Sequence, residues 1–346
     1  MAERRWTWEH LLVLVFGAGL VLFTLYRVTD VRRVAATHHL GPISGSAAQS
    51  SAAGARAELD ARISGYTLSA KASNDWSVWG TLAEAHLARA RLTGNYADYG
   101  AAAQNLQESF ARAAKGSGPL QLKAGLGLAV HRLADTEAAL NAIDHYALAD
   151  PPGQRAEQRA MRGDIALYRG DYAGARQLYG AAAALGGGPS AYCRTGNLDS
   201  LMGHYGEALA QFDKCEVSVP VRTPQFAANT EMSRGTVALA RGNWDDAAVR
   251  FQHADKLFPG YWMTAMRLAQ VQALRGDRAG AMAAFARIAE ASGNPEPMDV
   301  LAGLCRAAGD APQSRAWAAR AALIWQQRLK QLPEASYAHA LEHELA

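Results

Sequence analysis

Small and aromatic residues recur along most of the chain with one spacing. A small residue is followed by Ala or Ser twelve positions later and, in most copies, by an aromatic residue four positions further on. The six copies are Gly127–Ala139–Ile143, Gly163–Ala175–Tyr179, Gly196–Ala208–Phe212, Gly235–Ala247–Phe251, Ala269–Ala281–Phe285 and Ala302–Ser314–Ala318. A turn signature such as Gly170-Asp171 separates the two small residues, which lets one helix end and the next begin. The pattern predicts an all-α chain of stacked hairpins, whose helices meet where side chains are small.

Proline marks the expected end of five hairpins, eight to ten residues after the last position of the pattern, at Pro151, Pro189, Pro220, Pro259 and Pro295. These small, aromatic and proline positions, in this order, resemble the tetratricopeptide repeat (TPR) family. The resemblance implies a right-handed superhelical solenoid of about six or seven hairpins over residues 73–328. Its approximate repeats are 76–119, 120–152, 156–188, 189–221, 228–260, 262–294 and 295–328. Residues 329–346 are expected to form a capping helix.

The N-terminal region carries a different pattern. Residues 11–26 (LLVLVFGAGLVLFTLY) contain no charge, and with Trp6, Trp8 and Val28 the stretch is long enough to cross a bilayer. We predict a single transmembrane helix at residues 8–28, after a short tail at residues 1–10. An uncleaved signal anchor is the favoured interpretation, and a cleaved signal peptide or a buried helix are the alternatives.

The orientation of this anchor follows only weakly from its flanks, because arginines are almost evenly divided between them. A short N-terminal tail usually stays inside the cell. This places the solenoid outside the inner (cytoplasmic) membrane, in the periplasm if the protein is bacterial, while the cytoplasmic orientation stays open. Residues 29–72 are expected to be a juxtamembrane segment and a flexible Gly/Ser/Ala linker, with a short helix beginning at residues 58–63.

The TPR resemblance also implies a binding groove. In that family the first helices of successive repeats line a groove that takes peptides or partner helices. Carried onto this sequence, the positions one and five residues after each repeat's opening residue, with their neighbours, share polar or flexible side chains suited to a peptide. The candidate partner-binding residues are Asp164, Arg194, Asn197, Asn229, Met232, Thr236, Met266, Arg267 and Gln270.

The sequence offers few other candidate functional residues. A net charge of +3 over 346 residues gives no support for a nucleic-acid partner. Cys193, Cys215 and Cys305 have no metal-site spacing; Cys193 and Cys215 fall on one predicted hairpin and could meet, although buried free thiols are the favoured interpretation. His339 and His343 lie four apart on a predicted helix, but no third ligand accompanies them. We expect no catalytic residue, metal or cofactor.

Three functions fit these features. The favoured one is a membrane-anchored TPR scaffold that binds a protein or peptide partner and supports assembly of a membrane or envelope complex. The second is an accessory factor of a membrane enzyme or transporter, with the solenoid in the cytoplasm. The third is a metal-dependent enzyme centred on His339 and His343.

Overall fold

The computed structural model describes residues 40, 42–146 and 150–345. These residues form sixteen α-helices and one 3-10 helix, and they contain no β-strand. The expected all-α class is confirmed. The transmembrane helix predicted at residues 8–28 lies outside the described residues. Within the described part of the chain, no helix combines the length and the apolar character needed to cross a bilayer.

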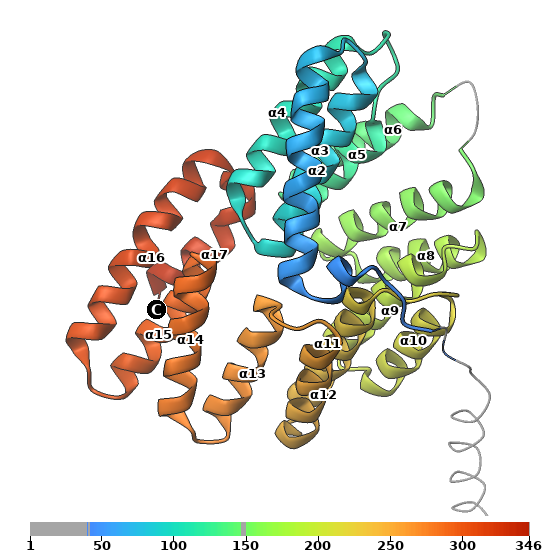
Figure 1. The fold of residues 1–346 in the computed structure, drawn as a ribbon. Helices are drawn as coiled ribbons and strands as arrows, with labels where there is room; N and C mark the ends of the chain where they lie inside the picture. The colour runs from blue at the N-terminus through green and yellow to red at the C-terminus, as the bar shows by residue number, and fades with distance from the viewer. Residues whose placement is uncertain (1–39, 41, 147–149, 346) are drawn as a thin grey trace, which may run out of the picture. The chain divides into compact units, whose positions relative to one another are not determined.

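The helices follow one another with short connections (Figure 1). Their bounds are η1 (Ala47–Ser50), α2 (Ala52–Ala72), α3 (Trp76–Thr93), α4 (Tyr96–Arg112), α5 (Leu120–Ala129), α6 (Leu133–Ile143), α7 (Pro152–Tyr168), α8 (Tyr172–Ala184), α9 (Gly188–Leu201), α10 (Tyr205–Val217), α11 (Pro224–Ala240), α12 (Trp244–Leu257), α13 (Trp262–Leu274), α14 (Arg278–Ser292), α15 (Pro295–Ala307), α16 (Ala311–Gln331) and α17 (Pro333–Leu345).

Helices α3 to α16 form seven consecutive antiparallel hairpins, from α3/α4 to α15/α16. Helix α2 packs on α3 at one end of the stack, and α17 packs on α16 at the other. Local sequence sets the turns: Gly170 and Gly242 adopt positive φ values of 80° and 73°, which favour glycine. The Asp171 and Asn243 side chains then cap α8 and α12 by accepting hydrogen bonds from backbone N–H groups.

In three hairpins the glycine of the spacing pattern faces the aromatic ring sixteen positions later; these are Gly163, Gly196 and Gly235. A Cβ atom added to Gly163 would lie 2.4 Å from Tyr179 Cε1, and one added to Gly235 would lie 2.4 Å from Phe251 Cε1. Both distances are well below van der Waals contact. The expectation that the small residues mark close helix contact therefore needs refinement, because the glycine makes room for the buried ring itself.

The segment expected to be a flexible linker is folded in its C-terminal part. Ser44 N donates to Arg222 O (2.9 Å), Arg222 N donates to Pro42 O (2.9 Å), and Ala52 N donates to Pro259 O (3.0 Å). Ser46 and Ser51 cap η1 and α2, and a Cβ on Gly54 would lie 2.2 Å from the Ala48 carbonyl oxygen. The Gly/Ser/Ala composition thus serves capping and close packing. We call residues 42–60 the N-terminal strap.

The first hairpin of the stack contacts the last, so residues 42–345 close on themselves. Arg328, only 5% exposed, donates to Asn294 Oδ1 (2.7 Å) and to Gly94 O (3.4 Å) and pairs with Glu296 (2.8 Å). Its guanidinium lies 3.9 Å from the Tyr96 ring centroid, and the Tyr96 hydroxyl donates to the Ala335 carbonyl (3.1 Å). Figure 1 shows α4 beside α16 and α17 at this junction.

The C-terminal region departs from the expected boundaries. Helix α16 continues without a break from Ala311 to Gln331, so the capping helix does not begin at residue 329 as expected. The break comes at Pro333, where α17 begins. Leu332 and Ala335 then pack into a cluster with residues of α3 and α4, among them Leu87 and Leu106. The capping segment therefore covers the first repeat as well as the last.

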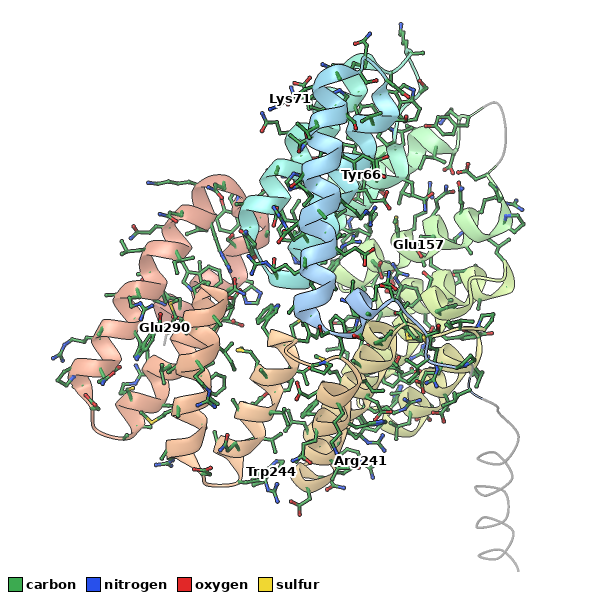
Figure 2. The ribbon with its side chains drawn as sticks, viewed as in Figure 1. Tyr66, Lys71, Glu157, Arg241, Trp244 and Glu290 are labelled. Carbon is green, nitrogen blue, oxygen red and sulfur yellow. A yellow bond between two sulfur atoms is a disulfide. The ribbon has the colours of Figure 1, made fainter. Side chains whose placement is uncertain are left out.

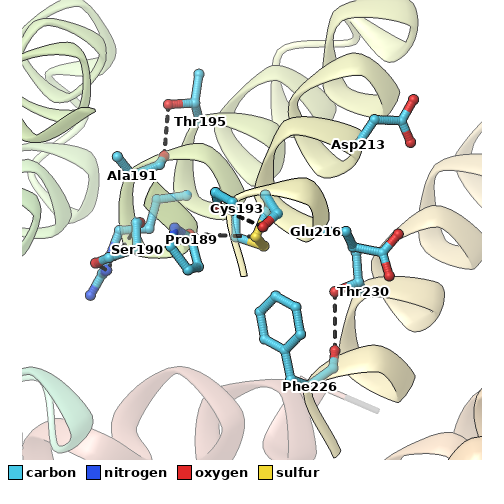
Figure 3. The surroundings of a disulfide bond; sticks show 12 residues. Pro189, Ser190, Ala191, Cys193, Thr195, Asp213, Glu216, Phe226 and Thr230 are labelled. Atoms are coloured by element: carbon cyan, nitrogen blue, oxygen red, sulfur yellow. Dashed lines mark hydrogen bonds between the residues drawn. A yellow bond between two sulfur atoms is a disulfide. The ribbon is translucent and has the colours of Figure 1, made fainter. Parts of the chain in front are cut away.

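Cys193 of α9 and Cys215 of α10 form a disulfide, with 5.3 Å between their Cα atoms (Figure 3). The favoured interpretation of two free thiols is wrong for this pair, because the antiparallel packing of one hairpin brings the two positions together. Cys305 is a buried free thiol. The disulfide fastens the fourth hairpin of the stack from within.

Candidate partner-binding groove

A hollow of about 940 Å³ opens between the N-terminal hairpins, and we call it the α3–α9 hollow. Residues of α3, α5 and α7 line most of it, with Tyr99 of α4 and Arg194 of α9. Aromatic side chains border it at Trp76 and Tyr168, which are 36% and 53% exposed. The hollow is large enough for a short peptide segment.

Two of the predicted partner-binding residues, Asp164 and Arg194, lie in this hollow and bind each other. Arg194 Nε donates to both oxygens of Asp164 (3.0 and 2.9 Å), and its terminal nitrogen lies 2.9 Å from Glu157 Oε1. Ser190 hydrogen-bonds to both Glu157 and Arg194, and Tyr179 donates to Asp164 (2.8 Å). Figure 2 labels Glu157 on α7. We call these side chains the Arg194 brace, since they tie α7 to α9.

The charges of the brace are unequal, with two carboxylates for one guanidinium. Burial raises the pKa of Asp164 above its ordinary value, and the Arg194 charge offsets only part of this effect. For Glu157, burial also acts to raise the pKa, but the charge and hydrogen bonds of Arg194 and Ser190 outweigh it and leave the pKa lowered. These side chains satisfy one another, so the brace stabilises the repeat junction whether or not a partner is bound.

Arg91 lies in the same hollow, outside the hydrogen bonds of the brace, and its charge interacts with that of Glu157. Its guanidinium donates to the Gly125 carbonyl at 3.3 Å, and no carboxylate pairs with it among the described residues. The residue is exposed, and neighbouring protein atoms that displace part of the water around the guanidinium lower its pKa. Arg91 is therefore an accessible cation in a concave part of the surface.

The other predicted residues do not gather in this hollow. Asn197 and Asn229 are exposed, and Arg267 donates to Gln270 (2.9 Å) on the same helix, α13. The remaining three are Met232, Thr236 and Met266. Thr236 donates to the Met232 carbonyl (3.0 Å), and Met266 packs against the cluster around Phe285.

Met232 is closed off inside the fold. Met232 is 9% exposed and belongs to the apolar cluster against which Ala52, Ala55 and Leu59 pack. Thr264 of α13 donates to Met232 Sδ (3.0 Å), so α13 closes part of the α11 surface that the TPR resemblance assigned to a partner. A second hollow of about 1180 Å³ lies between α2, α13, α14 and α16, and it contains none of the nine predicted residues.

The two C-terminal histidines have separate surroundings. His343 Nδ1 lies 2.6 Å from Asp299 Oδ1, and the Trp325 indole N–H donates to the other oxygen of Asp299 (2.8 Å). His339 stacks on the Trp325 ring, with 6.0 Å between centroids. In the part of the chain that the structure describes, no group of three or more His, Cys, Asp or Glu side chains could hold a metal ion. The pair therefore fastens α17 to α15 and α16.

Sequence reasoning missed the contribution of the first repeat to the hollow. Trp76, Glu84 and Arg91 of α3 all line it, but the first repeat departs from the regular spacing, so the groove positions were not carried onto it. One signal was available: Glu84 and Arg91 lie seven residues apart, which places both on one face of a helix.

Comparison with known proteins supports the fold alone. No protein-family model and no curated protein matches the chain. Among solved structures, Cut9 in the APC/C hetero-tetramer Cut9–Hcn1 is similar with a TM-score of 0.53 at 12% identity, over 75% of this chain and 49% of that chain. A TPR protein of Thermus thermophilus gives 0.43 at 19%, over 55% and 100%, and one of Parabacteroides merdae gives 0.44 at 18%, over 72% and 93%. The chain has a TPR-like fold.

Proposed function

We propose that this protein is a membrane-anchored TPR-like scaffold that binds a protein partner through the α3–α9 hollow and supports assembly of a membrane or envelope complex. The observation that carries the proposal is the hollow itself: about 940 Å³, open to solvent, bordered by exposed aromatic side chains and holding an accessible arginine. Such a surface offers apolar contact together with a few fixed polar groups, as peptide-binding sites do.

The charge-free stretch at residues 11–26 supports the anchor, and the disulfide supports the compartment. Disulfides persist in oxidising compartments such as the bacterial periplasm and are rare in the cytosol. A solenoid on the outer side of the membrane accounts for both features. The same disulfide counts against the cytoplasmic accessory factor.

Compartment and anchoring are tested by a topology reporter fused after Ala346, read together with fractionation of the membranes. We expect the full chain in the membrane fraction and reporter activity on the outer side. Recovery in the soluble fraction would remove the anchor, and reporter activity in the cytoplasm would restore the accessory-factor alternative.

The hollow is tested by a photo-cross-linking residue in place of Ala88, which lines it, and in place of the exposed Ala210 on α10 as the matched control. Irradiated membranes should give an adduct of one defined partner from position 88 and none from position 210. Equal cross-linking at both positions, or adducts only at position 210, would move the interface away from the hollow.

A further inference from the structure

Five charged side chains line the α3–α9 hollow, and the fold leaves two of them available. Glu157, Asp164 and Arg194 are engaged in the Arg194 brace. Glu84 and Arg91 line the same hollow and are exposed, and neither forms an ion pair with any other described residue. A partner in this hollow therefore meets one free anion and one free cation.

The spacing of these two charges is fixed by α3, which carries both. Seven residues are almost two full turns, so the side chains lie on one face of the helix. A rise of about 1.5 Å per residue separates their Cα atoms by about 10 Å along the axis. The free charges thus form a rigid pair, with the anion nearer the start of α3 and the cation nearer its end.

Arg91 is the stronger of the two recognition points. Its guanidinium is partly buried where it makes its hydrogen bond to Gly125 O, and this bond is long at 3.3 Å. A charge that has lost part of its hydration in this way interacts more strongly with an incoming carboxylate than one on an open surface does. The two-pronged geometry of the guanidinium favours a carboxylate over other acceptors.

We propose that the partner is an extended peptide segment with an acidic side chain that binds Arg91 and a basic side chain that binds Glu84. In polyproline II conformation, residues three positions apart lie on the same side of the chain and are about 9 Å apart. This separation matches the charges on α3. The inference rests on the proposed function, because it specifies the partner of the same hollow.

The test uses the full chain, solubilised in detergent, on an array of short random-sequence peptides. Bound peptides should be enriched in pairs of opposite charge three positions apart. Arg91→Gln should abolish the preference for the acidic residue only, and Glu84→Gln the preference for the basic residue only, each with about a tenfold loss for the best pairs. Arg159→Gln is the matched control, since Arg159 is exposed and lies outside the hollow.

Ala88→Trp, which fills the hollow, separates this inference from the proposed function. If Ala88→Trp abolishes binding but neither Gln variant changes it, the hollow remains the binding site and the proposed recognition by Glu84 and Arg91 is overturned. Enrichment of opposite charges seven residues apart would indicate a helical peptide and overturn the extended one. An array without any enrichment of charge pairs would overturn recognition of both the extended and the helical peptide. Binding that survives Ala88→Trp would overturn the proposed function itself.

Discussion

The packing of an aromatic ring against Gly163, Gly196 and Gly235 leads to a stability prediction that depends on the position of the glycine. Gly235 lies in α11 opposite Phe251 of α12, and an added Cβ would meet ring atoms at 2.4, 2.7 and 3.0 Å. Ordinary contact begins near 3.4 Å, so the ring or a helix must move by about 1 Å. Gly180 lies in α8, is exposed, and has nothing within 4 Å of an added Cβ. Both glycines thus have a helical backbone, and they differ in the room available for an added methyl group.

Gly235→Ala should destabilise the protein. Overpacking a well-filled core costs about 1–3 kcal/mol, while Ala gains about 1 kcal/mol over Gly in a helix interior. The net loss should therefore be up to about 2 kcal/mol. Gly180→Ala causes no overpacking and only improves helix propensity, so it should stabilise the protein by up to about 1 kcal/mol. The two substitutions should therefore shift stability in opposite directions.

Urea unfolding followed by far-ultraviolet circular dichroism measures both shifts, provided that the slope with urea stays constant. Phe251→Leu in the Gly235→Ala background completes a double-mutant cycle, and the two changes should couple favourably because the smaller side chain vacates the clash. The α13/α14 hairpin already pairs Ala269 with Phe285, so a methyl group can be accommodated when the helices pack around it. A Gly235→Ala protein at least as stable as the Gly180→Ala protein would refute the reasoning.

Three further predictions concern interactions that stabilise the stack of hairpins. Replacing both Cys193 and Cys215 by Ser should cost about 3 kcal/mol, because the disulfide closes a loop of 22 residues, and reductant should give the same loss in the wild type only. Arg328→Met leaves the partly buried Glu296 unpaired and should cost about 3 kcal/mol of stability. It should also raise the radius of gyration measured by small-angle X-ray scattering, because the first and last hairpins would separate. An unchanged radius would mean that this junction closes without Arg328. Burial acts to raise the pKa of Asp98, but hydrogen bonds from His86 and Arg89 outweigh it and hold the pKa below 3.8. The stability that comes from this lowered pKa is therefore present above about pH 4 and is lost as the pH falls further. Asp98→Asn should be less stable than the wild type at neutral pH, and its stability should fall less steeply in acid. Urea titrations at several pH values would measure both differences.

The candidate site was only partly predictable from sequence. Asp164 and Arg194 were selected as groove residues and do line the hollow, but their engagement with Glu157 in the brace depends on how α7 packs on α9. Charge reversal at Arg194 is therefore not a clean test of partner binding. It would leave Glu157 and Asp164 buried without a cation and destabilise the fold, so Arg91 is the better position for that test.

The hairpins and their turns follow from the sequence alone, because the spacing pattern that defines them spans sixteen residues and repeats along the chain. Only the tertiary structure decides how the ends of the stack meet. The Arg328–Gly94 contact joins residues 234 positions apart, and the strap pairs Ser44 with Arg222 through backbone groups that carry no side-chain signature. Local periodicity specifies each repeat, whereas closure depends on the summed twist of seven hairpins, to which no single residue pattern corresponds.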